Sequence, residues 1–297
     1  MGANSMYSCV ADNLIKRFHY EKKKLYLLVD STFDEIAQDI QKQHMNTEVI
    51  SFSSYTKENI KQIFELPPSA VVLLLADPES YLKYQLYQYL DFSHGEPQIG
   101  NTVSRVLIFP KDSIRRIFGV AIEKDTTTKN MLMTTMRNHQ KYRITTQNGT
   151  DLSFEAREWI PIDFEICTAP IEDLVNGVIV VDGALFFKEI DDTLAFTIEN
   201  GKVASITASS SKGQQLADEY LNMTEGIMKN PVNKQLAEIG IGFCNGAMIN
   251  DCFMEAETVV NTCHFCFGNN LCYGGNNASD FHGASILIKN PIFEQVQ

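Results

Sequence analysis

The most continuous apolar run in the chain is Ala70-Val71-Val72-Leu73-Leu74-Leu75-Ala76. It begins with β-branched residues, and short unbroken runs of this kind are typical of strands that are buried on both faces of a parallel sheet. The run is also far too short to cross a lipid bilayer. We therefore predict that residues 70–76 form a strand in the centre of a parallel sheet.

Strand and helix signals alternate on both sides of this run. Further β-type segments lie at residues 25–29, 48–52 and 106–109. Helical spacing of apolar residues occurs around Ile36 and Ile40, over residues 58–66, and from Pro78 through Leu90. This alternation predicts an α/β fold with a mostly parallel sheet over residues 1–140.

The pattern changes from about residue 142 onward, where short strands alternate with turn signals. The turn dipeptides are Asn148-Gly149, Asn176-Gly177, Asp182-Gly183 and Asn200-Gly201. Segments 194–198 and 203–206 flank the last of these and predict a hairpin. A helix is expected at about residues 213–228. Residues 141–297 are therefore expected to form a β-rich α+β domain, with the domain boundary near residue 140.

Composition limits the partners of the chain. The formal net charge of −12 argues against binding to nucleic acid, because phosphate binding needs a basic surface. The absence of a long apolar segment and of a secretory pattern in residues 1–13 leads us to expect no membrane association and a cytoplasmic location. In that compartment the seven cysteines are expected to be thiols rather than disulfides.

Three ionisable residues of the last third suggest a metal site. His264 and His282 flank a polar loop rich in glycine and asparagine, and Glu238 lies inside an apolar, strand-like run. A buried carboxylate needs a partner, and histidines that converge on it can bind a metal ion. The alternative is a set of polar core residues that satisfy one another.

Seven short blocks in the second half occur in an order that resembles the M29 (aminopeptidase T) family of metallopeptidases. They include Asn148-Gly149-Thr150-Asp151, Glu165-Ile166-Cys167-Thr168-Ala169-Pro170, Leu236-Ala237-Glu238-Ile239-Gly240-Ile241-Gly242, Thr262-Cys263-His264-Phe265 and Gly274-Gly275-Asn276. The resemblance covers about residues 142–288 and implies an aminopeptidase T-like second domain. The amino-terminal half shares only its α/β character and is shorter than is usual for the family.

The resemblance implies a centre that binds divalent metal ions. By position, the implied ligands are Glu165, Glu238, His264 and His282. Ala284 stands where the family's H-x-D motif has an aspartate, and Leu271 stands at the place of a tyrosine ligand, with Tyr273 two positions further on. Asp280 and Tyr273 are the auxiliary candidates. The remaining set is compatible with one zinc, iron, manganese or cobalt ion, or with none.

The resemblance leads us to expect a metal-dependent hydrolase that acts on a peptide or amino-acid-like substrate, as a homodimer. Glu257 is the candidate general base, and the alternative is a surface carboxylate without a partner. Two other functions remain open: a metal-free pseudoenzyme that binds a peptide or partner protein, and a mononuclear iron enzyme related to 2,5-dihydroxypyridine dioxygenases. Cys263 and Cys266 form a C-x-x-C in an expected strand, so their thiols should face opposite sides and pack in the core.

Overall fold

The computed structural model describes residues 8–17, 24–51, 71–76, 98–99, 102–120 and 122–296. The chain divides into two compact units, residues 1–122 and 123–297. The helices expected at residues 58–66 and 78–90 lie outside the described residues. The domain boundary near residue 140 stays a prediction, and helix α6 (Ile122–Thr135) falls almost entirely within the second unit.

The first unit contains a five-stranded, mostly parallel sheet in the order β2-β1-β3-β5-β4. Its described strands are β1 (Leu25–Val29), β2 (Thr47–Ser51), β3 (Val71–Ala76), β4 (Gln98–Ile99) and β5 (Thr102–Ile108). Among these strands, only the β4–β5 pairing is antiparallel. Strand β3 is central, as the apolar run predicts. Every residue of β1 is buried, because both faces of this strand are covered.

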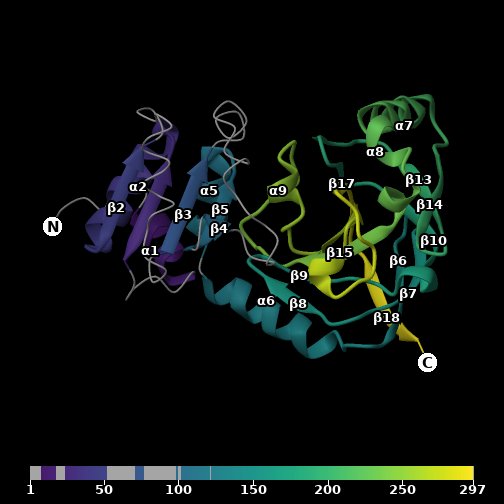
Figure 1. Cartoon of the computed structure of the whole chain (residues 1–297), viewed down its shortest axis with the longest axis horizontal. Helices are drawn as coiled ribbons and strands as arrows, with labels where there is room; N and C mark the ends of the chain where they lie inside the picture. The colour runs from purple at the N-terminus through teal and green to yellow at the C-terminus, as the bar shows by residue number, and fades with distance from the viewer. Residues whose placement is uncertain are drawn as a thin grey trace. The chain divides into compact units, whose positions relative to one another are not determined.

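Three described helices accompany this sheet (Figure 1). They are α1 (Ser8–Arg17), α2 (Asp34–Gln43) and α5 (Lys111–Gly119). Asp30 ends β1 and caps the turn that leads into α2, since its side chain accepts a hydrogen bond from the Thr32 amide. The Asn13 side chain joins α1 to the end of α5 by donating to the carbonyls of Phe118 and Val120.

The second unit contains two antiparallel sheets, as the β-rich pattern predicts. The six-stranded sheet has the order β14-β13-β10-β7-β6-β18, and the seven-stranded sheet has the order β12-β11-β17-β16-β15-β9-β8. The first comprises β6 (Lys141–Thr145), β7 (Asp151–Glu155), β10 (Asn176–Val181), β13 (Leu194–Glu199), β14 (Lys202–Thr207) and β18 (Ile292–Val296). The second comprises β8 (Ile160–Ile162), β9 (Glu165–Thr168), β11 (Ala184–Leu185), β12 (Lys188–Glu189), β15 (Leu236–Gly242), β16 (Thr262–Gly268) and β17 (His282–Lys289).

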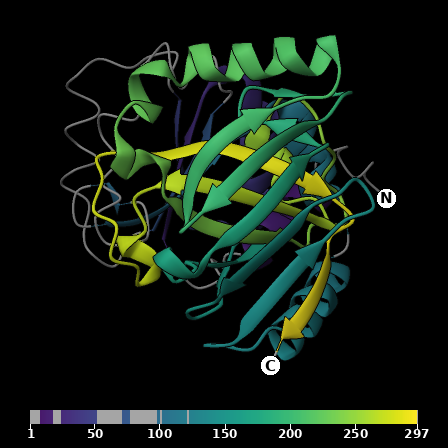
Figure 2. The same cartoon turned by 90° about the vertical axis from the view of Figure 1, so that its right-hand side faces the viewer.

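The two sheets enclose one hydrophobic core, and Figure 2 shows them one behind the other. Phe196 of the six-stranded sheet stacks on Phe267 of the seven-stranded sheet, with ring centroids 6.3 Å apart. The expected hairpin is present as β13 and β14, with Asn200 and Gly201 at positive φ in its turn. Because side chains alternate along a strand, Ile239 and Ile241 of β15 point into this core, as do Cys263, Phe265 and Phe267 of β16. The residues between them point to the opposite face of the seven-stranded sheet.

The helix expected at residues 213–228 is present as two helices, α7 (Ser211–Met223) and α8 (Glu225–Met228). The interruption is at Thr224, whose hydroxyl donates to the Tyr220 carbonyl and whose backbone leaves the helical region. Another short helix, α9 (Phe253–Ala256), precedes β16. Among the helices that the structure describes, none has the length and apolar character needed to cross a membrane.

Candidate metal centre

The candidate residues gather on one face of the seven-stranded sheet, because three adjacent strands present them in register. Cys167 of β9 pairs with Gly240 of β15, and Gly240 pairs with His264 of β16. Glu238 stands two residues before Gly240, so it projects from the same face of β15. The intervening residues, such as Ile239, enter the core between the two sheets. Strand alternation thus separates a polar face from an apolar one.

Gly240 allows the side chains of the flanking strands to approach one another. A Cβ atom at position 240 would lie 2.0 Å from Cε1 of His264 and 2.4 Å from its Nε2. The imidazole therefore lies across the backbone of β15, where only glycine leaves room for it. This close approach explains why a glycine interrupts the apolar run of β15.

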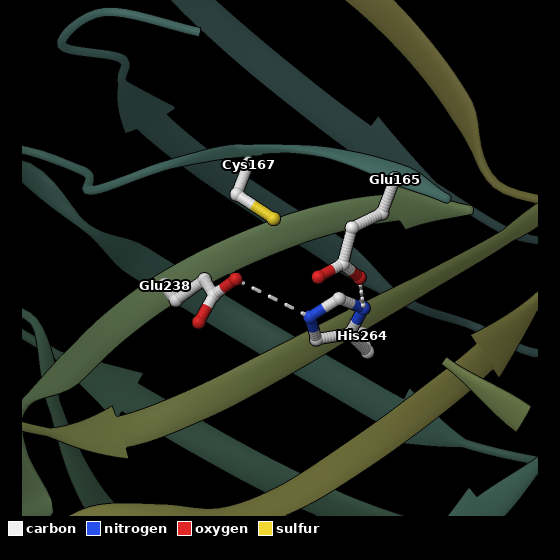
Figure 3. Close-up of side chains that lie close together, drawn as sticks. All are labelled: Glu165, Cys167, Glu238 and His264. Carbon is white, nitrogen blue, oxygen red and sulfur yellow. Dashed lines mark ion pairs between the residues drawn. The ribbon is translucent and has the colours of Figure 1, made fainter. Parts of the chain in front are cut away.

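His264 lies between two carboxylates and is 1% exposed. Its Nδ1 is 3.4 Å from Oε2 of Glu165, and its Nε2 is 3.6 Å from Oε1 of Glu238. Figure 3 shows these side chains and Cys167 pointing toward one another. Both distances exceed those of good N–H···O hydrogen bonds. Within the described part of the chain, Glu165 Oε2 and His264 Nδ1 are buried without any hydrogen-bond partner.

His282 approaches Glu238 from the edge of the cluster. Its Nδ1 is 2.6 Å from the Asn269 carbonyl oxygen, and its Nε2 is 2.9 Å from Oε2 of Glu238. A carbonyl oxygen only accepts, so Nδ1 is the donor and Nε2 is the atom directed at the cluster. Histidines that bind metals are commonly oriented by such a bond from the other ring nitrogen. The side chain of His282 is 33% exposed, so the cluster is open to solvent on this side.

The charges of the cluster favour a cation among the carboxylates. Burial opposes the charged form of His264, but its interactions with Glu165, Cys266 and Glu238 together outweigh burial and raise the histidine pKa well above its ordinary value. Burial also opposes the charged form of Glu238, but interactions with His264 and His282 outweigh it and lower the pKa of Glu238. The pKa of Glu165 is raised, mainly by burial. Positive charge is therefore stabilised here, whether protons or a metal ion supply it.

Two groups of side chains offer donor atoms to a metal ion. The first is Glu165, Cys167, Glu238 and His264, and the second is Glu238, Cys266 and His282. Within each group the donor atoms all lie within 4.8 Å of one another. Two donors that share a tetrahedral zinc ion are separated by roughly 3.4 Å, as bond lengths of about 2.0–2.1 Å require. The 3.4 Å separation of the ion-paired atoms Glu165 Oε2 and His264 Nδ1, neither of which has a hydrogen-bond partner among the described residues, matches this value, so the residues present fit a metal ion.

The four implied ligands Glu165, Glu238, His264 and His282 thus come together in one cluster, and their roles as ligands stay a prediction. The sequence does not predict that Cys167 and Cys266 also lie among the donor atoms. Each stands two residues after a candidate ligand, Glu165 or His264, and so shares its side of the strand. Strand alternation applied to these two blocks was the signal that could have identified them.

The C-x-x-C expectation holds only in part. Cys263 is buried in the core between the sheets, while Cys266 faces the opposite side, so the prediction that the two thiols face apart is confirmed. Cys266 is buried as expected, but it faces polar groups and lies outside the core cluster between the two sheets. Its Sγ lies 2.9 Å from the hydroxyl oxygen of Ser285, beside the second group of donors.

The auxiliary candidates differ in their placement. The Tyr273 ring centroid is 5.9 Å from that of His282, and burial together with the charge of Glu238 raises the pKa of Tyr273. Asp280 is exposed and belongs to neither donor group of the described chain. Glu257 is partly buried at the end of α9, and its burial raises its pKa to about 7. It interacts electrostatically with His264, Glu238 and His282, so it is not an isolated surface carboxylate.

Ala284 contributes its backbone rather than a side-chain donor. The pairing of β16 with β17 shifts register between Phe265 and Phe267, and Ala284 has a φ of 50°. This bulge directs the alanine into the apolar core, where its carbonyl accepts a 2.6 Å hydrogen bond from the Tyr220 hydroxyl. Ser285, and not residue 284, then stands beside Cys266.

Comparisons with known proteins support the fold. No protein-family model and no curated protein sequence matches the chain. Among solved structures, a 2,5-dihydroxypyridine dioxygenase from Pseudomonas putida KT2440 matches with a TM-score of 0.66 at 14% identity, over 99% of this chain and 94% of that one. AmpT from Thermus thermophilus matches with a TM-score of 0.61 at 11% identity, over 98% of this chain and 95% of that one.

The chain therefore has the fold of AmpT and of the dioxygenase, and the expected fold class is confirmed. The likeness extends through the amino-terminal half, where only a general α/β character was expected. At such low identity the likeness concerns the fold, which an aminopeptidase and a dioxygenase share.

Proposed function

We propose that this chain is a metal-dependent hydrolase that acts on a peptide or amino-acid-like substrate. Glu165, Glu238, His264 and His282 are the proposed ligands of a divalent zinc, iron, manganese or cobalt ion. The proposal of a metal centre is supported by Oε2 of Glu165 and Nδ1 of His264, which are buried, form an ion pair across 3.4 Å and have no hydrogen-bond partner among the described residues. In a set of polar core residues that satisfy one another, such atoms would form hydrogen bonds.

A metal ion bound by these residues would polarise a carbonyl group and lower the pKa of a bound water. The protein's own side chains would orient the substrate and move the proton. His282 is held by the Asn269 carbonyl, so its Nε2 stays directed at the cluster. The exposed side of His282 is the proposed entry for substrate, and Tyr273 borders it.

The choice of hydrolysis depends chiefly on Glu257. This carboxylate comes at the end of α9, whose Phe253 ring makes an edge contact with His264 at a centroid distance of 6.5 Å. Its pKa of about 7 suits a group that accepts a proton from water near neutral pH and then returns it to the leaving amine. We therefore assign Glu257 as the general base.

The test compares metal content and peptide hydrolysis in the intact protein. The purified wild type should contain a stoichiometric metal ion after growth with zinc, iron and manganese, and should hydrolyse members of a panel of short peptides. Glu257→Gln should retain the metal and lose about 100-fold or more in kcat, the usual scale for a general base. The exposed Glu199→Gln is the matched control and should retain activity. A wild type without a stoichiometric metal ion would exclude this function.

A mononuclear iron oxygenase is the second candidate, and the structural likeness to the dioxygenase favours it. Oxygen consumption under ferrous iron, with dihydroxypyridines and related heterocycles, distinguishes it from the hydrolase. A protein that contains no metal and turns over neither substrate class would instead support the pseudoenzyme, which binds a peptide or a partner protein. The homodimer is likewise a proposal, and analytical ultracentrifugation of the intact chain tests it.

A further inference from the structure

We propose that the Cys167 sulfur is a direct ligand of the metal ion, so that the first group is a mixed nitrogen, oxygen and sulfur centre. This inference rests on the proposed metal centre and specifies its chemistry. Cys167 is fully buried, and its Sγ lies within 4.8 Å of the donor atoms of Glu165, Glu238 and His264. In Figure 3 the sulfur points toward the two carboxylates.

The register of the sheet explains how the thiol reaches this position. Cys167, Gly240 and His264 lie side by side on three adjacent strands. Because Gly240 has no side chain, nothing on the middle strand separates the thiol of β9 from the imidazole of β16. Cys167 also follows Glu165 by two residues, so both side chains project from the same side of β9.

The surroundings of Cys167 differ from those of an ordinary buried cysteine. A structural cysteine behaves as a small hydrophobe and packs against apolar atoms. Cys263 does this, since it lies in the core between the two sheets. Cys167 instead faces two carboxylates and a histidine, including the buried Glu165 oxygen and His264 nitrogen that have no hydrogen-bond partner among the described residues. The Cys167 sulfur is therefore placed to act as a further donor beside the proposed ligands.

A sulfur ligand changes which metal ions the centre selects. Thiolates favour zinc and similar borderline ions, whereas magnesium, calcium and manganese prefer oxygen donors. A mixed set of nitrogen, oxygen and sulfur donors is compatible with zinc. The centre should therefore bind zinc and cobalt far more tightly than magnesium or calcium, and zinc in preference to manganese.

Cobalt binding to the intact, metal-depleted protein tests the inference. The wild type should develop visible ligand-field bands together with a near-ultraviolet sulfur-to-cobalt charge-transfer band. Cys167→Ser should keep the ligand-field bands, lose the charge-transfer band and bind cobalt more weakly by at least the roughly 10- to 100-fold that the loss of an outer-shell partner costs. Cys263→Ser is the matched control, because that thiol is equally buried on the opposite face of the sheet, and it should retain the band. Cys266→Ser, which alters the second donor group, should also retain it.

The outcomes separate this inference from the proposed function. Ligand-field bands without a charge-transfer band in the wild type would leave the metal centre standing and overturn the sulfur ligand. A charge-transfer band that survives in Cys167→Ser but disappears in Cys266→Ser would also overturn it. No cobalt binding at all would reject both proposals. If Cys167→Ser does not fold, X-ray absorption of the zinc-loaded wild type decides: a sulfur at about 2.3 Å is expected, and only lighter scatterers would contradict it.

Discussion

The guanidinium of Arg157 donates a 2.7 Å hydrogen bond to Oε2 of Glu172, and this pair fastens the loop before β17 to the sheet. The other oxygen of Glu172 accepts from the Asn270 side chain at 2.9 Å and from the Asn276 amide at 2.7 Å. The same loop carries Tyr273 and ends at His282. Glu172 thus fixes the segment that borders the open side of the candidate centre.

The charge of Glu172 should contribute to the free energy of unfolding at neutral pH, and this contribution should be lost in acid. Burial opposes its charge, but the hydrogen bonds from Asn276, Arg157 and Asn270 outweigh it, so the folded pKa is about 2 against an ordinary 4.5. The stabilisation is therefore complete above pH 4.5 and is lost as pH falls toward 2. Glu172→Gln should lower the free energy of unfolding by about 1 kcal/mol at pH 7. This value is small for hydrogen bonds to a charged group, because Glu172 is only partly buried and solvent screens its charge.

Denaturant unfolding of wild type and Glu172→Gln at several pH values checks this prediction. The difference in the free energy of unfolding between wild type and Glu172→Gln should shrink as pH falls below 4.5, the ordinary pKa of the carboxyl group. The exposed Glu158→Gln serves as control and should match the wild type throughout. A difference that does not change between neutral and acid pH would contradict the role of the Glu172 charge.

Gly240→Ala should disrupt the centre through a steric clash. A Cβ atom at this position would meet the His264 ring at 2.0 Å, so the imidazole or the strand must move. We expect a loss of about 1–3 kcal/mol in the free energy of unfolding, as for other overpacked sites, together with reduced metal content. Gly226→Ala in α8 is the control, because no described heavy atom outside its chain neighbours and its own helix backbone lies within 4 Å of that Cβ position. Equal metal content in both variants would contradict the prediction.

Tyr220→Phe should weaken the bulge of β17 without removing a donor from the cluster. The variant leaves the buried carbonyl of Ala284 without the 2.6 Å hydrogen bond that it accepts from the tyrosine hydroxyl. The expected cost is about 1–3 kcal/mol in the free energy of unfolding, the penalty for an unsatisfied buried group. Calorimetry measures this cost, and metal analysis should find the wild-type content. Unchanged stability would show that the bond does not support the bulge.

Hydrolytic activity should fall on the acid side of neutrality if Glu257 is the base. A base acts only when deprotonated, and burial raises the pKa of Glu257 to about 7. A bound cation favours the carboxylate, so the observed midpoint should be at or below this value. The dependence of kcat on pH in the metal-saturated enzyme measures it. A kcat that stays constant down to pH 5 would remove Glu257 from this role.

Much of this architecture was predictable because it depends on local periodicity. The apolar run at residues 70–76 identified the central strand, and Asn200-Gly201 identified the hairpin of β13 and β14. The break in the helix at Thr224 was not visible, since a threonine within a helical pattern signals no particular end. Elements were therefore predicted better than their interruptions.

The candidate centre was predictable only as far as single strands determine it. The sequence marks Glu238 as a candidate because it is charged within an apolar run, and His282 because it borders the polar loop. Alternation along β9 puts Cys167 on the same side as Glu165, but only the register of β9 against β15 places it beside Gly240 and near the other donors. The bulge that turns Ala284 into the core is likewise a property of strand pairing and not of the local sequence.

Glu165, Glu238, His264 and His282 are proposed to surround a metal ion. Element-specific anomalous scattering from crystals of the metal-loaded protein tests this proposal most directly. We expect one strong peak or more within bonding distance of His264 and the carboxylates of Glu165 and Glu238. Maps without any such peak, in which the two histidines bind the carboxylates through protons alone, would contradict it.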